Sequence, residues 1–303
     1  MSTRVTQGMM SQTMLYNLQQ NNSLMNKLQQ QAATGEKISR PSDDPVVAVR
    51  GMYYQSTLTD IDQYKKNADD GYSWMSSTDD ALDQVNQVLQ RVRELTVQGQ
   101  NGTNTQSDKE AIAQEVDQLK DQLGEIANSQ IAGRYIFAGT DTSTAPYGTD
   151  PNNPDSEATF LSDNEQQLQV QVGQNTPIPI NVSGKDVFNN NGQGGVFQVL
   201  SDIVSDFSSS DGSTTSDHLA DLDSQIDNVL QLRSDLGARM NRMQLSQSRL
   251  DGLETSTTDL LSKNSDVDMA SVYTDLKSQE TVQSAALEIG ARIIQPTLAD
   301  FLK

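Results

Sequence analysis

The sequence predicts a mainly α fold: a long antiparallel helical rod with terminal coiled-coil helices and a small β-rich insertion domain. Three observations lead to this prediction. Thin apolar stripes with helical spacing occupy both ends of the chain. Longer stripes lie inside them, and a segment rich in Gly, Pro and Asn separates their two halves. Hydrophobic residues make up only 34% of the chain, which favours long helices with narrow seams over a thick core.

The two ends of the chain present narrow apolar stripes that each need a partner helix. Between residues 264 and 303 the apolar positions are mostly three, four or seven residues apart: Val267, Val272, Leu276, Val282, Ala286, Ile289 and Ile293. The first forty residues show heptad spacing at Met14, Leu18, Met25, Leu28 and Ala32, with Asn21 in the seam. Because such stripes cannot form a globular core alone, we expect the ends to pair with each other or with copies of themselves.

The N-terminal half of the predicted rod is bounded by Gly, Pro and Asp signals. A first helix, after a loose start, ends near Thr34 and Gly35, where Gly suits the C-cap. Asp44 followed by Pro45 predicts the next helix start, with a capping carboxylate before a first-turn proline. The pattern that follows either resets near residues 69–71 or continues as one bent helix.

Further helices complete the rod and lead back to the C-terminal stripe. From Asp80, apolar residues step by three and four until a turn at residues 99–105. Ser107, with a Glu three residues later, has the spacing of a capping box and predicts the second arm of an αα-hairpin. A long helix from Asp217 keeps the same spacing for about forty residues, and residues 265–268 recap the last helix.

The middle of the chain has the character of a β-rich insertion. Residues 134–137 form a short β-prone run between two glycines, and residues 167–172 alternate polar and apolar side chains. The Ile-Pro-Ile sequence at 178–180 suggests an edge strand. Residues 208–216 are rich in Ser and are expected to form a flexible joint.

These boundaries predict three domains folded from nested segments. Residues 1–40 and 263–303 form the two halves of the terminal coiled-coil domain. Residues 41–138 and 215–262 form the two halves of the helical rod domain, and residues 139–214 form the β-rich outer domain.

Composition and charge exclude several classes of partner. The formal net charge of −20, with a pI of about 4.2, would repel nucleic acid and anionic membranes, so we expect neither as a partner. No stretch approaches the roughly 18 apolar residues of a membrane span. Residues 1–10 lack the apolar region of a cleavable signal peptide. The absence of cysteine excludes disulfides, thiol catalysis and Cys-based metal sites.

Catalytic and cofactor motifs are missing, so we expect no enzyme activity, no cofactor and no metal. The sequence has no phosphate-binding G-x-x-x-x-G-K-[ST], no G-x-G-x-x-G after a strand and no H-E-x-x-H. Asp43 and Asp44 could form an acid–base or metal pair, but a helix cap is the simpler interpretation. His218, the only histidine, is expected to be an exposed first-turn residue. Loop solvation similarly explains, better than a cation site, the insertion acids Asp141, Asp150, Asp155 and Asp163.

Several segments of the chain resemble flagellins. The run Gln-Arg-Val-Arg-Glu-Leu-Thr-Val-Gln at 90–98, followed by Asn-Gly-Thr at 101–103, is similar to the flagellin core domain. The Asp-Asp pair at 43–44, before a helix, resembles the N-terminal motif of the family. Asp-Val-Asp-Met-Ala at 266–270 resembles its C-terminal motif.

Two further segments resemble one branch of this family, the junction proteins between flagellar hook and filament. They are Arg-Pro-Ser-Asp-Asp-Pro at 40–45, with prolines where flagellins usually carry Ala, and Gly-Arg-Tyr-Ile-Phe-Ala-Gly at 133–139. The resemblance implies a structural role. Terminal helices would face the central channel of a helical ring of copies, with the rod as the next shell and the β domain outside.

The same resemblance implies the partners and the location. The partners would be further copies of the chain, the hook-side junction protein, flagellin and a dedicated export chaperone bound to the C-terminal helix. The protein would be extracellular in the bacterial flagellum, and cytoplasmic before type III export.

The candidate functional residues come from the stripes and from the resembling segments. Candidates for the assembly seam and for chaperone binding are Met14, Leu18, Met25, Leu28, Val272, Leu276, Val282, Ala286, Ile289 and Ile293. Candidates for rod contacts are Asp43, Asp44, Arg91, Arg93 and Glu94. For Arg91 and Arg93, salt bridges to acidic neighbours are the plainer role, and binding of an innate immune receptor, as in flagellin, is a further hypothesis.

Several alternatives remain open at this point. The terminal stripes could simply pack within one bundle. The chain could be a flagellin, the bulk filament subunit, or a coiled-coil adhesin or phage-like fibre. Because a seam containing Met, Ala, Asn and Gln buries little against the entropy of chain ordering, we expect it to become rigid only beside other copies or a holder.

Overall fold

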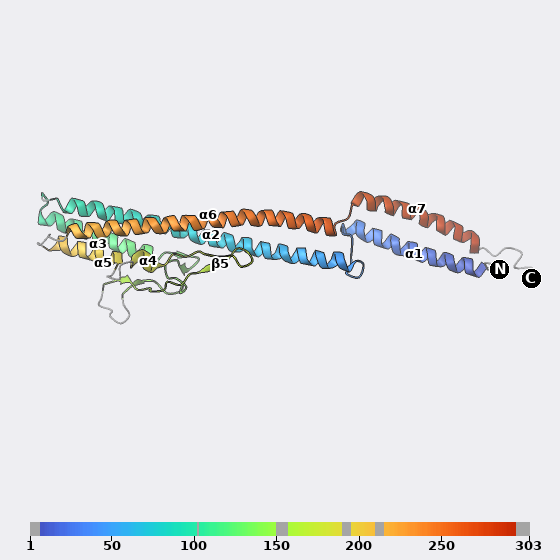
Figure 1. Cartoon of the computed structure of the whole chain (residues 1–303), viewed down its shortest axis with the longest axis horizontal. Coiled ribbons are helices and arrows are strands. Elements are labelled where there is room, and N and C mark those ends of the chain that lie inside the picture. Colours follow the sequence, from blue (N-terminus) through green and yellow to red (C-terminus); the bar gives the residue numbers. More distant parts are fainter. Residues whose placement is uncertain (1–6, 102, 150–156, 190–194, 210–214, 295–303) are drawn as a thin grey trace, which may run out of the picture. The chain divides into compact units, whose positions relative to one another are not determined.

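The computed structural model describes residues 7–101, 103–149, 157–189, 195–209 and 215–294. Within these ranges the fold is mainly α, with seven helices and three two-stranded antiparallel sheets, which confirms the predicted fold class (Figure 1). Among the described residues, no helix has a stretch both long and apolar enough to cross a membrane.

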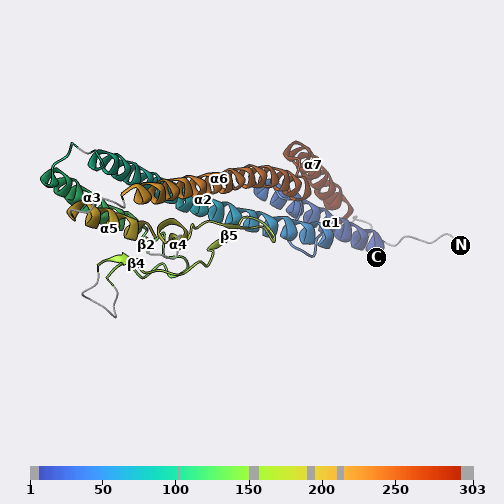
Figure 2. The same ribbon diagram turned by 60° about the vertical axis from the view of Figure 1, so that its left-hand side comes forward.

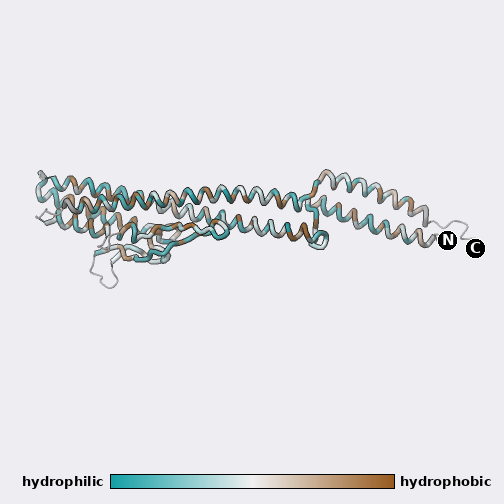
Figure 3. The backbone as a smooth tube through the Cα atoms, viewed as in Figure 1, coloured by the Kyte–Doolittle hydropathy of each residue, from teal (hydrophilic) through white to brown (hydrophobic). Residues whose placement is uncertain are grey.

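The chain divides into two compact units that share two long helices. Unit 1 contains the residues up to Asp60 and those from Leu253 onward, and unit 2 contains Ile61–Gly252. The shared helices are α2 (Pro45–Gly99) and α6 (Thr215–Ser265). Both helices carry hydrophobic residues at intervals among hydrophilic ones along their whole length, as expected for narrow apolar stripes (Figure 3).

Unit 1 is built around the helices α1 (Gln7–Thr34) and α7 (Met269–Ile294), which lie side by side (Figures 1 and 2). The loops that follow α1 and α6 are joined by an antiparallel bridge between Glu36 and Asp266. The backbone N–H of Lys37 donates to the carbonyl of Ser265 at 2.7 Å. These bonds join the loop that follows α1 to the loop that follows α6.

The helix boundaries in unit 1 follow the predicted capping signals. Gly35 ends α1 with φ of +75°, the left-handed conformation that glycine adopts at little cost. The Asp44 carboxylate accepts bonds from the N–H groups of Val46 and Val47 at 3.0 and 3.1 Å and so caps α2. The Asp268 carboxylate accepts from the N–H of Ala270 at 3.0 Å and caps α7.

Helix α2 runs without a break through residues 69–71, so the second of the two interpretations of this segment is correct. Gly71 is buried there, and a Cβ atom at this position would lie 2.9 Å from Cε of Met243 and 3.2 Å from Cγ2 of Ile180. The glycine therefore allows close packing of α2 on its neighbours in unit 2.

The predicted αα-hairpin forms, but its second arm begins earlier than the capping prediction placed it. Helix α3 spans Gln106–Ala127 and its N-cap is Thr105, not Ser107. Thr105 and Asp108 make the reciprocal bonds of a capping box, with the Asp108 carboxylate accepting from the Thr105 N–H at 2.9 Å.

The insertion consists of short hairpins and two helices. The paired strands are β1 (Gln130–Ile131) with β2 (Arg134–Tyr135), β3 (Tyr147–Gly148) with β4 (Thr159–Phe160), and β5 (Gln169–Gln171) with β6 (Pro177–Pro179). Helix α4 spans Gly184–Phe188 and α5 spans Gly195–Ser208. Helix α5 lies in the region predicted to be β-rich, and it packs along α3 (Figure 2).

Unit 2 holds the hydrophobic core. It joins the residue-61–99 part of α2, the helices α3, α4 and α5, the hairpins and the residue-215–252 part of α6 around side chains such as Leu89, Val116, Phe188 and Leu222. Phe188 lies edge-on to Phe137 at 5.3 Å between ring centroids and 5.8 Å from the Phe197 ring. The insertion therefore shares one core with the helices that carry it.

Candidate assembly interface

The pairing of α1 with α7 uses an unbroken heptad seam on both helices. The least exposed residues of α1 along this seam are Met14, Leu18, Asn21, Met25 and Leu28. Those of α7 are Val272, Leu276, Gln279, Gln283, Ala286 and Gly290. Both sets step by four and three, the spacing that keeps one face of each helix against its partner. The two ends of the chain thus pair with each other within one molecule.

Most of the seam candidates from the sequence lie in this seam, and two do not. Met14, Leu18, Met25, Leu276 and Ala286 are half-buried there. Leu28 and Val272 are fully buried, at 8% and 4% exposure. The prediction that Val282 and Ile289 share the stripe is wrong, because their side chains are 46% and 55% exposed. The side chain of Ile293 lies outside the described residues. The proposed roles of all these residues in assembly and chaperone binding stay predictions.

The residues that occupy the positions expected for Val282 and Ile289 are Gln283 and Gly290. A Cβ atom on Gly290 would lie 2.7 Å from Cε of Met14, so glycine makes room for the methionine side chain. Unbroken 4–3 spacing from Val272 to Gly290 was the signal that could have identified these residues. A search for hydrophobic residues alone misses this spacing, because Gln283 and Gly290 are not hydrophobic.

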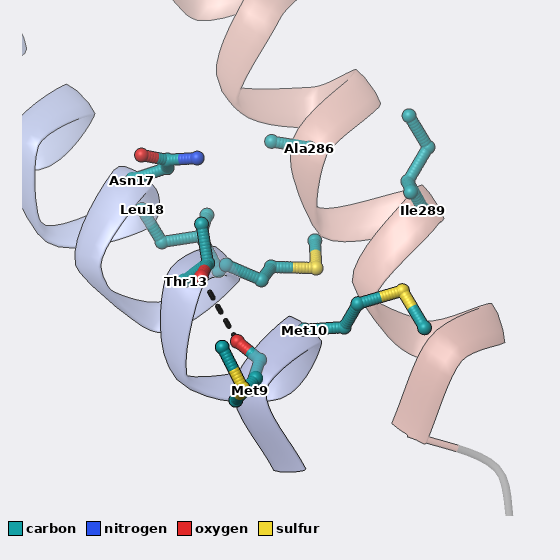
Figure 4. Close-up of a pocket in the computed structure, with 8 residues that line it drawn as sticks. Met9, Met10, Thr13, Asn17, Leu18, Ala286 and Ile289 are labelled. Atoms are coloured by element: carbon teal, nitrogen blue, oxygen red, sulfur yellow. Dashed lines mark hydrogen bonds between the residues drawn. The ribbon is translucent and has the colours of Figure 1, made fainter. Parts of the chain in front are cut away.

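An apolar groove of about 550 Å³ lies along the seam near the start of α1. Figure 4 shows Met10 and Ile289 on its two sides, with Leu18 and Ala286 further along. Thr13 at its edge is hydrogen-bonded to its own helix, its hydroxyl donating to the carbonyl of Met9 at 2.9 Å. The groove therefore offers mainly sulfur and carbon atoms to whatever covers it.

Unit 1 exposes many large hydrophobic side chains beyond this groove. On α1 and α7 they are Met9, Met10, Leu15, Tyr16, Leu24, Met269, Tyr273, Val282, Leu287 and Ile289. On the parts of α2 and α6 that belong to unit 1 they are Val46, Val49, Met52, Tyr53, Leu253 and Leu260. Residues 5–26 also contain no charged side chain, in a chain with a net charge of −20. A surface of this kind is typical of an interface.

The acidic pair at the start of α2 acts as a local cap. Asp43 accepts a bond from the backbone N–H of Arg40 at 3.1 Å, and Asp44 caps the helix as described above. Their geometry supports the capping interpretation. Among the described residues, no group of three or more His, Asp or Glu side chains is placed to hold a metal ion.

The arginines of the flagellin-like stretch form ion pairs in unit 2. Nη2 of Arg91 lies 2.7 Å from Oε1 of Glu115 on α3, and Nη1 lies 3.2 Å from Oε2 of Glu94. These carboxylates, Glu115 first, raise the pKa of Arg91. Nε of Arg93 lies 2.5 Å from Oδ1 of Asp223 on α6. The salt-bridge interpretation of both arginines is thus supported, and receptor binding stays a prediction.

His218 differs from its prediction. Its side chain is only 16% exposed, and its Nε2 lies 3.1 Å from Oδ2 of Asp206 on α5. It therefore joins the start of α6 to the end of α5. Of the four insertion acids, Asp141 bonds the hydroxyl of Ser143 at 2.8 Å, which together with Thr144 lowers the pKa of Asp141. Asp163 is exposed, and Asp150 and Asp155 lie outside the described residues.

Comparison with known proteins places this geometry in a family. The description "bacterial flagellin N-terminal helical region" matches residues 5–142, and "bacterial flagellin C-terminal helical region" matches residues 219–302. Together the two regions cover most of the chain. The chain belongs to the flagellin family. It is therefore a flagellar component of a structural family, as the resembling segments predicted.

Relatives of two kinds match over most of their length. Flagellar hook-associated protein 3 of Escherichia coli (strain K12) is 25% identical over 283 residues, covering 86% of this chain and 87% of the relative. The flagellin of Bacillus subtilis (strain 168) is 25% identical over 298 residues, covering 93% of each. Overall identity does not separate the two kinds.

Two solved structures share the fold. One, assigned to a flagellar hook-associated protein from Vibrio parahaemolyticus, has a TM-score of 0.68 and 21% identity and covers 74% of this chain and 100% of that one. The other, flagellar hook associated protein-3 from Legionella pneumophila, has a TM-score of 0.63 and 16% identity, with 70% and 98% covered. At these identities the likeness supports the fold and nothing finer.

Proposed function

We propose that this chain is a structural adaptor of the flagellum that joins the hook, through the hook-side junction protein, to the flagellin filament. Copies assemble helically through α1 and α7 after type III export, and a dedicated chaperone holds the C-terminal helix before export. The chain acts by matching surfaces and catalyses nothing. The single observation that carries this proposal is the surface of unit 1, which has no charged side chain from Gln7 to Asn26 of α1 and is rich in exposed apolar side chains.

The preference for the junction over the filament comes from two short segments. Residues 40–45 and 133–139 resemble the junction branch of the family. In the structure, Ala132 and Gly133 both have positive φ, and they turn the β1–β2 hairpin at the entry to the insertion. The competing candidate is a flagellin, favoured by the match to the Bacillus subtilis protein over 93% of each chain.

Gene deletion separates the two candidates. A strain without the junction adaptor should build hooks that carry no filament, and it should release unassembled flagellin into the medium. A strain without its bulk filament subunit would also lack filaments, but no flagellin would appear in the medium. That second result would contradict the adaptor role.

A variant tests whether the apolar surface of unit 1 carries the assembly. Ile289→Glu places a charge at the edge of the groove on a side chain that is 55% exposed, so the monomer should keep its helicity. It should fail to restore motility to the deletion strain, because burial of an unpaired carboxylate is costly. Leu245→Glu in unit 2, at a 71% exposed site, is the matched control and should restore motility. Equal rescue by both variants would contradict the proposal.

A further inference from the structure

The seam between α1 and α7 contains one polar layer between apolar ones. Asn21 of α1 lies in the seam at the level of Gln279 and Gln283 of α7, and Nε2 of Gln279 donates to the main-chain carbonyl of Asn21 at 3.5 Å. Nε2 of Gln283 donates to Oδ1 of the neighbouring Asn22 at 2.6 Å. Oε1 of Gln283 is buried without a hydrogen-bond partner among the described residues.

Apolar residues flank this layer on both sides. Towards the loops that join α1 and α6 to their neighbours, the seam holds Met25, Leu28, Val272 and Leu276. Towards the groove it holds Met14, Leu18, Ala286 and Gly290. Among the seam positions named above, this is thus the only layer made of polar side chains.

A shift of the two helices by one heptad would separate the polar residues. In one direction Asn21 would face Val272 and Leu276, while the two glutamines would face Met14 and Leu18. In the other direction Asn21 would face Ala286 and Gly290, and the glutamines would face Met25 and Leu28. Either shift removes the bond between the Gln283 and Asn22 side chains and places polar side chains against apolar ones, which costs free energy.

We propose that Asn21, Gln279 and Gln283 determine the register of the α1–α7 pair. A polar residue at a seam position of a coiled coil is known to specify register at a cost in stability. We expect the same effect here. Leucine at these three positions would stabilise the seam, but the native and shifted registers would then differ little in free energy. The layer would then serve any α1–α7 pairing, within one copy or between two. This inference goes beyond the junction role and does not depend on it.

The absence of cysteine makes the register measurable in the full-length chain. Met25→Cys with Leu276→Cys reports the register of the structure. Leu18→Cys with Leu276→Cys reports a shift of one heptad. Each pair is introduced into the native sequence and into a leucine background that carries Asn21→Leu, Gln279→Leu and Gln283→Leu. Intramolecular disulfide formation is followed at low temperature and low protein concentration, with circular dichroism as the check that the helices are present.

In the native sequence the shifted pair should form its disulfide at least about tenfold more slowly than the native pair. In the leucine background the two rates should agree within about twofold, and the terminal helices should melt at a higher temperature. A control background with leucine at the exposed positions Asn26, Ser278 and Thr281 should keep the native ratio. The proposal is overturned if the shifted pair stays about tenfold slower in the leucine background, or if both pairs react equally in the native sequence. Because neither reporter involves hook or filament, these outcomes leave the junction role untouched.

Discussion

Unit 1 and unit 2 are both built from long helices, yet they bury their side chains very differently. Among the described residues, unit 1 has two buried hydrophobic side chains, Leu28 and Val272. All the other buried hydrophobic side chains belong to unit 2. The large exposed hydrophobic side chains show the opposite distribution. Val97, Leu161, Leu230 and Leu245 are those of unit 2, and all the rest lie in unit 1.

This difference in burial indicates which unit can be stable alone. Unit 2 has a continuous core that offsets the entropy of ordering its chain. In unit 1 a two-helix seam with a polar layer supplies little burial, while the hydrophobic side chains that could add to it face outward. Unit 1 therefore has the composition of a surface that other molecules complete.

Matched Leu→Ala substitutions in the two units should differ most. Leu89 is 1% exposed in the core of unit 2, so Leu89→Ala should lower the free energy of unfolding by about 3 kcal/mol. Leu18 is half-buried in the terminal seam, and Leu18→Ala should cost less than about 1 kcal/mol. Trp74, the only tryptophan, is buried in unit 2 and reports its unfolding in denaturant. If the two substitutions lowered the free energy of unfolding equally, the seam of unit 1 would be as well packed as the core of unit 2.

The ion pairs of unit 2 should contribute less than its core. Arg233 on α6 bonds two carboxylates of α2, with Nε 3.0 Å from Oδ1 of Asp79 and Nη1 2.6 Å from Oδ1 of Asp83. Arg233→Ala would leave these like charges one helical turn apart without a counterion, so we expect a loss of about 1 kcal/mol. Arg93→Ala, at the more exposed pair with Asp223, is the control and should cost less than Arg233→Ala. The reverse order would contradict the packing of α6 on α2.

The smallest effect should be a dependence on pH at the base of the insertion. Nζ of Lys120, which is 8% exposed, lies 3.1 Å from Oε2 of Glu157 and 3.3 Å from Oγ of Ser201 on α5. The Lys120 bond holds the pKa of Glu157 below its ordinary value of 4.5. The stabilisation is therefore present above that value and is lost as the pH falls through the lowered pKa.

Denaturant unfolding followed from pH 6 down to pH 3 checks this pair. The wild type should lose slightly more stability over this range than Glu157→Gln, in which nothing titrates at this position. The same substitution should have less effect at pH 3 than at pH 6, because the wild-type carboxylate is increasingly protonated as the pH falls. Parallel pH curves for the two proteins would show that the pair contributes nothing.

Much of the helical fold could be predicted because its signals are local. Asp44, Asp268 and Gly35 mark helix ends through their own backbone bonds and conformation. Helix α5 was missed although Val196, Leu200, Ile203 and Phe207 have helical spacing, because the surrounding Gly, Asn and Ser indicated loops and strands. The cap at Thr105 was missed because Ser107 carries an equally good local signal, and only the packed position of α3 decides between them.

The interface was harder to predict, since hydrophobicity and seam position are different properties. Val282 and Ile289 are hydrophobic and lie off the seam, whereas Gln283 and Gly290 lie in it. The sequence does not indicate which face of α7 meets α1 and which faces remain free. That depends on the contacts between helices far apart in the chain, including the one between Gly290 and Met14.

Amide hydrogen exchange on the dilute monomer and on the assembled protein tests the central contrast most directly. We expect the α1 and α7 amides of the monomer to exchange at least about a hundredfold faster than those of α2, α3 and α6 in unit 2, and to become protected on assembly. If α1 and α7 in the dilute monomer were protected as strongly as the helices of unit 2, unit 1 would be stable alone and would not need other copies to complete it.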